Sequence, residues 1–465
     1  MTTANPDPIE HREPQTPKRY PHSRRNFTLG LLNGIFMRFA YSFADSQTVL
    51  PVFVIILTES PILAGIVAGL FEAGWYLPQI FVSNLVQHRE RKLPLYRAMA
   101  YVRAASWVAA AVSVFLIGAR SPSLVFWAFF LCYLGVCLGA GTAAISFMDI
   151  VGKSFPPQRR GSFFAYRRLI GGLLGIGAGM VVARVLSPGS GLAFPHNYSV
   201  IFGFTAVFAV AGLASFSMVK EPIEPVSPAR VRFRDHLRSC GRILQEDTNY
   251  RRYFTQRVLA SLSLMALPFY ATYAVTVLGA ETAQVGVMVS LWMLSGMLSN
   301  ALWGTLSDRK GSRVLVVASS ALAVIPPIVA LGSFLVPSRP IALPPVLSFW
   351  LPECLCEVDL RLLVFLSCFV LNGFSDAARK VSISAYLLDI SPALLRPTYV
   401  GLMNTISSPL ALAPALGGLI TQMFSYRAVF SISLVFALLA FGVSLRLAEA
   451  KLPGPGEHEI VTRAT

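Results

Sequence analysis

Seven charged side chains stand within stretches of this sequence that are otherwise apolar. A charge in a membrane or protein interior is costly unless it is paired or hydrated, so such residues are candidates for function. Acids and bases of this kind can exchange protons, bind an ionic solute or form a static ion pair, and the sequence leaves both the functional and the structural role open. The seven residues are Arg38, Asp45, Glu72, Arg103, Asp376, Arg379 and Lys380.

Two groups of these charges have a spacing that predicts contacts. Asp376 and Lys380 are four residues apart, which places them on one face of a helix and predicts an ion pair. Arg379 would then be left for an anionic substrate or for another helix. Arg38 and Glu72 each lie about 16 Å into their apolar stretches at ~1.5 Å per residue, near the middle of a core of about 30 Å. They are predicted to pair, either as a static link or as partners that exchange a proton or a substrate group.

No recognisable catalytic or metal-binding arrangement is present in the sequence. The glycine-rich run 171–179 lies in an apolar stretch and lacks the Lys-Ser/Thr pair of a phosphate-binding loop, so it favours close helix packing instead. The six cysteines are scattered without metal-ligand spacing, and Cys354 and Cys356 share a polar loop. We therefore expect no catalytic residue, no metal site, no cofactor and no enzymatic activity.

The composition is that of a protein that crosses a membrane many times. Of the 465 residues, 54% are hydrophobic and 13% are charged, and the mean hydropathy is +0.60. Soluble proteins have about 25% charged residues. The net charge of +16 can indicate nucleic-acid binding, but the cations gather in loops on one side of the apolar stretches. The positive-inside rule explains this pattern, so the expected partner is the lipid bilayer and not nucleic acid.

Twelve apolar stretches are long enough to cross a bilayer as helices, which predicts an all-α fold. Most loop cations lie on the side of the two termini, whereas the loop 337–360 holds three acids and Arg339 as its only internal cation. Both termini are therefore predicted to be cytoplasmic. The stretches are 27–57, 61–87, 93–118, 122–149, 161–186, 197–219, 253–278, 282–307, 312–336, 361–389, 397–424 and 426–448.

The twelve stretches divide into two similar halves. In each half an acid ends the fourth stretch, Asp149 in the first and Asp389 in the second, and a short loop with proline follows. Apolar residues such as Phe233 recur at helical spacing between the halves, which predicts an amphipathic linker helix; a calmodulin-like target or a lipid-binding patch are alternatives. The predicted parts are a disordered tail 1–26, a six-helix bundle 27–219, a linker 220–252, a second bundle 253–448 and a tail 449–465.

Residues 304–313 form a charged segment between two apolar stretches, with the sequence Gly-Thr-Leu-Ser-Asp-Arg-Lys-Gly-Ser-Arg. Gly304 is expected to allow close approach of two helices, Gly311 to adopt a positive φ, and Asp308 to bond the amino end of the next helix. This spacing resembles the loop signature of the major facilitator superfamily of transporters, in the second of its two positions. A degenerate first copy has Gln87 at the place of Asp308.

The resemblance implies twelve helices in two pseudo-symmetric six-helix bundles that rock about a central site. Spans one, two and ten of that family face this site, which implies a pathway for substrate or ions along Arg38, Asp45, Glu72, Asp376, Arg379 and Lys380. The signature itself implies a cytoplasmic gate made of Gly304, Asp308, Arg309, Gly311 and Arg313. Aromatic residues near the charges are expected to line the cavity or to pack between helices, namely Tyr41, Trp75, Tyr76, Tyr270, Tyr273 and Trp292.

These features predict a secondary active transporter in a bacterial inner membrane, acting as a monomer on a small-molecule substrate. Proton-coupled efflux of small organic or amphipathic compounds is the first hypothesis. Uptake of a small, anionic solute is the alternative. A membrane receptor or scaffold that does not transport is disfavoured, because it has no reason to keep dispersed charges within its spans.

Overall fold

The computed structural model describes residues 20, 22–87, 89–118, 120–223, 243–342, 357–392 and 396–449. Within these ranges, the side chains of residues 79–87, 157, 308, 342, 357, 384, 396–398 and 405–406 are not described. The amphipathic helix predicted around Phe233 lies outside the described residues, as do Cys354 and Cys356.

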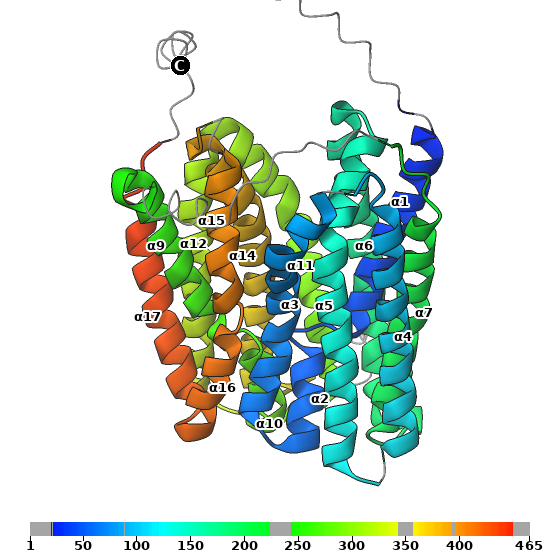
Figure 1. Ribbon diagram of the computed structural model, residues 1–465. Coiled ribbons are helices and arrows are strands. Elements are labelled where there is room, and N and C mark those ends of the chain that lie inside the picture. The colour runs from blue at the N-terminus through cyan, green and yellow to red at the C-terminus, as the bar shows by residue number, and fades with distance from the viewer. Residues whose placement is uncertain are drawn as a thin grey trace, which may run out of the picture.

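Two bundles of long helices stand side by side (Figure 1). The first consists of α1 (Ser23–Phe43), α2 (Val49–Thr58), α3 (Pro61–Gln87), α4 (Leu93–Ile117), α5 (Pro122–Ser154), α6 (Pro157–Leu186) and α7 (His196–Ser217). The second consists of α9 (Thr248–Ser263), α10 (Phe269–Thr276), α11 (Gln284–Lys310), α12 (Ser312–Gly332), α14 (Leu360–Ile390), α15 (Arg396–Leu410), α16 (Ala413–Met423) and α17 (Tyr426–Ser444). Helix α1 begins inside the segment predicted as a tail, and α9 begins inside the predicted linker.

The prediction of twelve spans is confirmed. In the described part of the chain, 11 helical segments are long and apolar enough to cross a membrane, and α1 together with the short apolar α2 makes up the first span. Three short 3₁₀ turns are also present: η1 (Pro188–Ser190), η2 (Leu264–Ala266) and η3 (Ser333–Leu335).

A small hairpin precedes the tenth span. Strands β1 (Pro340–Ala342) and β2 (Glu357–Asp359) pair antiparallel, with Ile341 opposite Val358. Asp359 then caps α14 by accepting a hydrogen bond from the backbone N–H of Arg361 at 2.7 Å. The hydroxyl of Ser338 also donates to this carboxylate and holds the pKa of Asp359 below its ordinary value.

Three spans predicted as continuous helices are broken in the middle. Span seven is interrupted before Pro268 and span eleven before Pro414, where the missing N–H of proline prevents an unbroken helix. Span one is interrupted at residues 44–48. There the carboxylate of Asp45 accepts hydrogen bonds from the backbone of Gln47 at 3.0 Å and the hydroxyl of Thr48 at 2.8 Å. These bonds satisfy part of the polar groups that the break exposes, although the Gln47 Oε1 atom is buried without a partner among the described residues.

Similar contacts in both bundles tie together the end at which α1 begins and α17 ends, here called the terminal face. Asn26 bonds the backbone of Lys220 after α7, and Asn249 bonds the backbone of Ala448 after α17. Asp149 pairs with Lys92 at 2.6 Å, and Asp389 accepts a hydrogen bond from the Ser312 hydroxyl at 2.5 Å.

In each half, the acid at the end of span four or ten thus bonds the start of span three or nine. The predicted equivalence of Asp149 and Asp389 corresponds to an equivalent contact in both halves.

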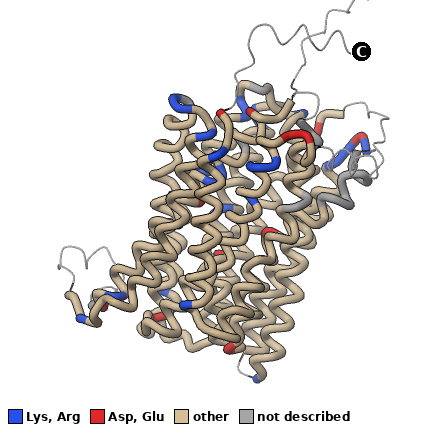
Figure 2. The backbone as a smooth tube through the Cα atoms, turned by 90° about the vertical axis from the view of Figure 1, so that its left-hand side faces the viewer, with Lys and Arg blue, Asp and Glu red and all other residues tan. Residues whose placement is uncertain are grey.

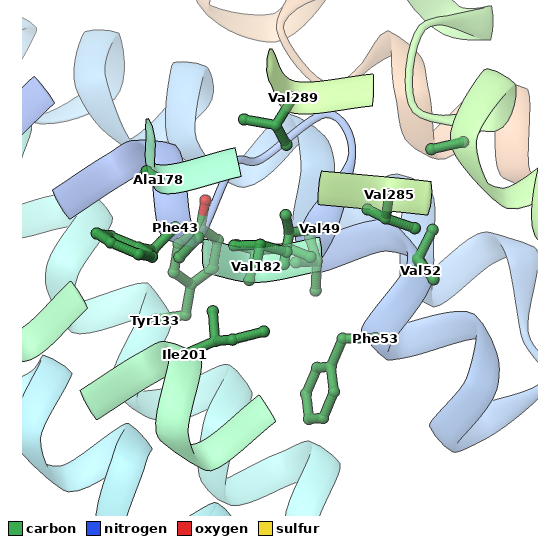
Figure 3. Packing of buried hydrophobic residues seen from close by; sticks show 14 of the residues in the cluster. Phe43, Val49, Val52, Phe53, Tyr133, Ala178, Val182, Ile201, Val285 and Val289 are labelled. Atoms are coloured by element: carbon green, nitrogen blue, oxygen red, sulfur yellow. The ribbon is translucent and has the colours of Figure 1, made fainter. Parts of the chain in front are cut away.

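The bundles meet most closely in the half remote from the termini, whose end is here called the opposite face. A Cβ placed on Gly179 of α6 would lie 2.2 Å from Ser290 Oγ of α11, and one on Gly65 of α3 would lie 2.1 Å from the carbonyl oxygen of Pro414. Buried side chains of α2, α6 and α11, including Val49, Val182 and Val285, pack together in the same region (Figure 3). This conformation is closed at the opposite face.

The signature segment differs from its predicted form. Helix α11 continues through Lys310, so residues 304–310 are helical, and the turn consists of Gly311 with φ 80°. Among the described residues, no atom lies within 4 Å of a Cβ placed on Gly304, so the expected close approach of helices there is wrong. The side chain of Asp308 is outside the described part of the structure. Arg313 bonds Glu449 at 3.4 Å, and its exposed neighbours Arg309 and Lys310 project from the last turn of α11.

Glu221 and Glu449 each follow the last helix of their bundle, and a comparison of the two gives a first prediction. Glu221 accepts hydrogen bonds from the backbone N–H groups of Lys92 and Leu93 at 2.8–2.9 Å, and its side chain is 2% exposed. Glu221→Gln is expected to lower the free energy of unfolding by about 1–3 kcal/mol, because buried charge-assisted hydrogen bonds are weakened. Glu449→Gln is the matched control, since that side chain is 86% exposed and its ion pair contributes little. Equal melting temperatures for the two variants in detergent would contradict this account.

Labelling of cysteines tests the orientation of the chain. If the terminal face is cytoplasmic, Cys354 and Cys356 in the loop between spans nine and ten are external. An impermeant thiol reagent added to intact cells should then label them, while the buried Cys137 and Cys368 stay protected. Labelling that requires permeabilised cells would reverse the orientation.

Candidate functional site

A cavity of about 450 Å³ lies between the two bundles, and all six residues of the predicted pathway line it. Helix α1 contributes Arg38, the break in span one contributes Asp45, and α3 contributes Glu72. The remaining three charges, Asp376, Arg379 and Lys380, lie within two turns of α14. Residues up to 342 positions apart in sequence therefore line one cavity. Their role in transport remains a prediction.

Aromatic side chains form much of the rest of the wall. Tyr41, Trp75, Tyr76 and Trp292 line the cavity, as the sequence analysis allowed. Tyr270 and Tyr273 instead pack within the second bundle, where Tyr270 stacks on Phe430 with ring centroids 5.0 Å apart. The cavity thus offers both flat apolar surfaces and charges to a solute.

Asp376 is the common counter-ion of its two basic neighbours. Its carboxylate lies 2.5 Å from a guanidinium nitrogen of Arg379 and 2.5 Å from the ammonium of Lys380. The predicted pair of Asp376 and Lys380 is present. The expectation that Arg379 would be left without an acidic partner is wrong, because positions i+3 and i+4 both face the acid on a helix.

Arg38 and Glu72 do not form the predicted ion pair in this structure. Arg38 approaches α6 and α11: its Nη2 lies 3.7 Å from Met293 Sδ, and its Cβ would lie 2.9 Å from a Cβ placed on Gly171. Glu72 lines a second cavity together with residues of α9 and α15. Both charges line the larger cavity, but Arg38 lies against α6 and α11, whereas Glu72 also borders the small cavity beside α9 and α15.

Arg103 lies behind the cavity wall and not in it. Its buried guanidinium donates a hydrogen bond of 2.7 Å to the hydroxyl oxygen of Tyr41, which lines the cavity. Because arginine can only donate, the hydroxyl proton of Tyr41 remains available for another acceptor. Arg103 is therefore a positioning residue for a cavity tyrosine.

The sequence analysis missed Arg257 of α9. This arginine lines the second cavity, of about 90 Å³, which it shares with Glu72, Tyr76 and Arg379. Its side chain is buried, and its Nε has no hydrogen-bond partner. The position of Arg257 inside the apolar stretch 253–278 could have identified it. It lies close to the cationic end of that stretch, however, and so resembled a charge of the preceding loop.

Comparison with known proteins identifies the family to which this fold belongs. The sequence profile of the Major Facilitator Superfamily matches residues 138–351 and 253–462. This chain belongs to the Major Facilitator Superfamily. A search of curated proteins finds no match to it.

Solved structures of other transporters share the superfamily fold with this chain. A bacterial homologue of the iron transporter ferroportin, in its inward-facing state, has a TM-score of 0.63 at 16% identity, over 91% of this chain and 98% of that one. A POT family transporter in complex with a thioalcohol-conjugated peptide has a TM-score of 0.64 at 10% identity, over 91% and 95%. A mutant of the nucleoside transporter NupG has a TM-score of 0.63 at 14% identity, over 90% and 100%. At these identities the likeness establishes the fold alone.

Proposed function

We propose that this superfamily member is a proton-coupled secondary transporter of small organic solutes that works by alternating access. One observation carries the proposal: a single cavity between the two bundles gathers six charged and six aromatic side chains. A solute bound there touches both bundles, so their relative motion can expose it to either face. Glu72 is the proposed proton carrier, because in the described part of the chain it forms no ion pair or hydrogen bond.

The terminal face is proposed to be the cytoplasmic side of a bacterial inner membrane, with the chain working as a monomer. Lys and Arg are concentrated at this face (Figure 2), which supports the orientation under the positive-inside rule.

The proposed solute is an organic molecule and not a metal ion. Within the described residues, no three His, Cys, Asp or Glu side chains gather where they could hold a metal. Tyr41, Trp75 and Trp292 offer faces for an apolar or aromatic body. Export of amphipathic compounds remains the first hypothesis for the direction of transport.

Uptake of an anionic solute is the second candidate, and one observation favours it. The two cavities are lined by four cations, Arg38, Arg257, Arg379 and Lys380, against the three acids Asp45, Glu72 and Asp376. A solute with one negative charge would balance this set.

A flux assay tests the function and separates the two candidates. Compounds that raise the melting temperature of the purified protein are first selected from a panel of metabolites and drugs. Each is then added outside proteoliposomes that contain a pH-sensitive dye. We expect a solute-dependent pH change in the lumen that Glu72→Gln abolishes. Acidification indicates symport and alkalinisation indicates antiport. Solute flux without any proton movement would refute the proposed coupling.

A further inference from the structure

Arg257 is a buried cation without a partner for its charge among the described residues. Its side chain is 9% exposed, and it forms neither an ion pair nor a hydrogen bond there. An unpaired charge in a membrane-embedded interior is costly, so a structural role for Arg257 offers no compensation for its burial. Its guanidinium faces a cavity of about 90 Å³.

Arg379 borders the same small cavity from the neighbouring helix α14. One of its terminal nitrogens is bound to Asp376, while its Nε has no hydrogen-bond partner. The charges of Arg257 and Arg379 repel each other. The guanidinium groups of these two arginines have N–H donors that are not used in hydrogen bonds. Such donors can bind the two oxygens of a carboxylate.

Glu72 is the only acid that lines this small cavity in the described part of the chain, and it comes from the other bundle. It attracts both arginines but lies beyond ion-pair distance from each. The other titratable or charged groups that line the small cavity with it are Tyr76 on its own helix, Arg257 on α9 and Arg379 on α14. Glu72 also lines the larger cavity, where the further charged groups are Arg38, Asp45, Asp376 and Lys380. The break in span one and α15 contribute the neutral side chains of Gln47 and Asn404.

We propose that Arg257 and Arg379 form a binding subsite for the carboxylate of a monoanionic organic solute, and that Glu72 competes with this carboxylate for them. This subsite rests on the proposed transport function and deepens its second candidate. The organic body of the solute occupies the adjoining cavity of about 450 Å³, which shares Gln47, Glu72, Tyr76 and Arg379 with the small one. Arg379 already has an ion pair with Asp376, whereas Arg257 has none among the described residues, so the carboxylate of a solute with one negative charge can pair with Arg257.

Competition between the two carboxylates couples the solute to a proton. An ionised Glu72 supplies negative charge to the arginines and repels a second carboxylate. When Glu72 is protonated it no longer carries this negative charge, so the two arginines can bind the carboxylate of the solute. Solute binding therefore takes up one proton from water, and both cross the membrane in the same direction.

A set of three matched probes tests the subsite in the purified full-length protein. Phenylacetate, phenylacetamide and phenethylamine share one ring and differ in the charge of the end group. By calorimetry at pH 5.5, we expect phenylacetate to bind at least tenfold more tightly than the other two. Its Kd is expected to rise with pH, by up to about tenfold per pH unit, because one proton is bound with it.

Three substitutions assign the effect to the named residues. Arg257→Gln should weaken phenylacetate binding at least tenfold, and Arg257→Lys should weaken it less because the charge remains without the fork. Glu72→Gln should bind phenylacetate with the same Kd at pH 5.5 and pH 7.5. Arg251→Gln, an exposed arginine on the same helix, is the control and should match the wild type.

Several results would overturn the subsite. These are equal binding of the three probes, wild-type affinity in Arg257→Gln, unchanged pH dependence in Glu72→Gln, or no binding of phenylacetate or acetate at pH 5.5. If Arg257→Gln does not fold, the Glu72→Gln titration and Arg257→Lys still decide. Failure of the transport proposal gives another result. The wild type would then move neither solute nor protons in proteoliposomes, even if it binds phenylacetate. If a folded Arg257→Gln variant still shows proton-driven flux, the subsite proposal is wrong and the transport proposal stands.

Discussion

Gly179→Val is expected to reduce transport at least tenfold while leaving each bundle folded. A Cβ at Gly179 would lie 2.2 Å from Ser290 Oγ and 2.5 Å from the carbonyl oxygen of Gly286, both on α11 of the other bundle. The hydroxyl of Ser290 also donates to the carbonyl of Ile176 at 3.0 Å, so this seam is closely fitted. Overpacking costs about 1–3 kcal/mol or more, and each ~1.4 kcal/mol changes a population tenfold.

The conformation closed at the opposite face would therefore become rare, and alternating access needs it. Gly177→Val is the matched control on the same helix, because no described atom lies within 4 Å of its Cβ position. Flux in proteoliposomes reports the loss of transport. The distance between spin labels at Leu192 and Leu335, one on each bundle and both exposed at the opposite face, reports the opening after removal of native cysteines. Equal flux and equal distances in the two variants would show that the seam does not limit the cycle.

Asp376→Asn is expected to have the largest effect among the cavity charges. The substitution leaves Arg379 with a buried, unbalanced charge and also deprives Lys380 of its partner. Removing one member of a buried ion pair costs about 3–5 kcal/mol. A clear fall in melting temperature and complete loss of flux should follow.

Lys380→Gln is the appropriate comparison for this variant. The side chain of Lys380 is 57% exposed, against 18% for that of Arg379, and Arg379 still balances Asp376 when Lys380 is neutral. The melting temperature of Lys380→Gln should therefore stay close to that of the wild type. If Asp376→Asn is as stable as Lys380→Gln and transports normally, the carboxylate is not the organising charge of the cavity.

Contacts within one helix followed from the sequence for a simple reason. The pair of Asp376 and Lys380 depends only on helical periodicity. Periodicity also implies that Arg379, at i+3, can reach Asp376, although the initial interpretation assigned it elsewhere. The failed pair of Arg38 and Glu72 is of another kind, since it required the rotation of two helices about their axes.

Helix breaks and close approaches between helices were harder to predict from the sequence. The break in span one lies just before Pro51, and the carboxylate of Asp45 bonds the backbone of Gln47 within it. Gly304 and Gly179 are both glycines in apolar stretches of similar composition, yet only Gly179 meets another helix. What lies opposite a glycine is a property of its neighbour and leaves no mark in the local sequence.

The sequence by itself determined the number of spans, the repeat of the two halves and the superfamily resemblance. These follow from transfer free energies and from patterns along the chain, which are local. Only the tertiary structure decided which charges meet, that Arg257 joins Glu72 and Arg379 around a small cavity, and that the bundles close at the opposite face. The physical reason is that these contacts join residues far apart in the chain, and their positions depend on how all the helices pack together.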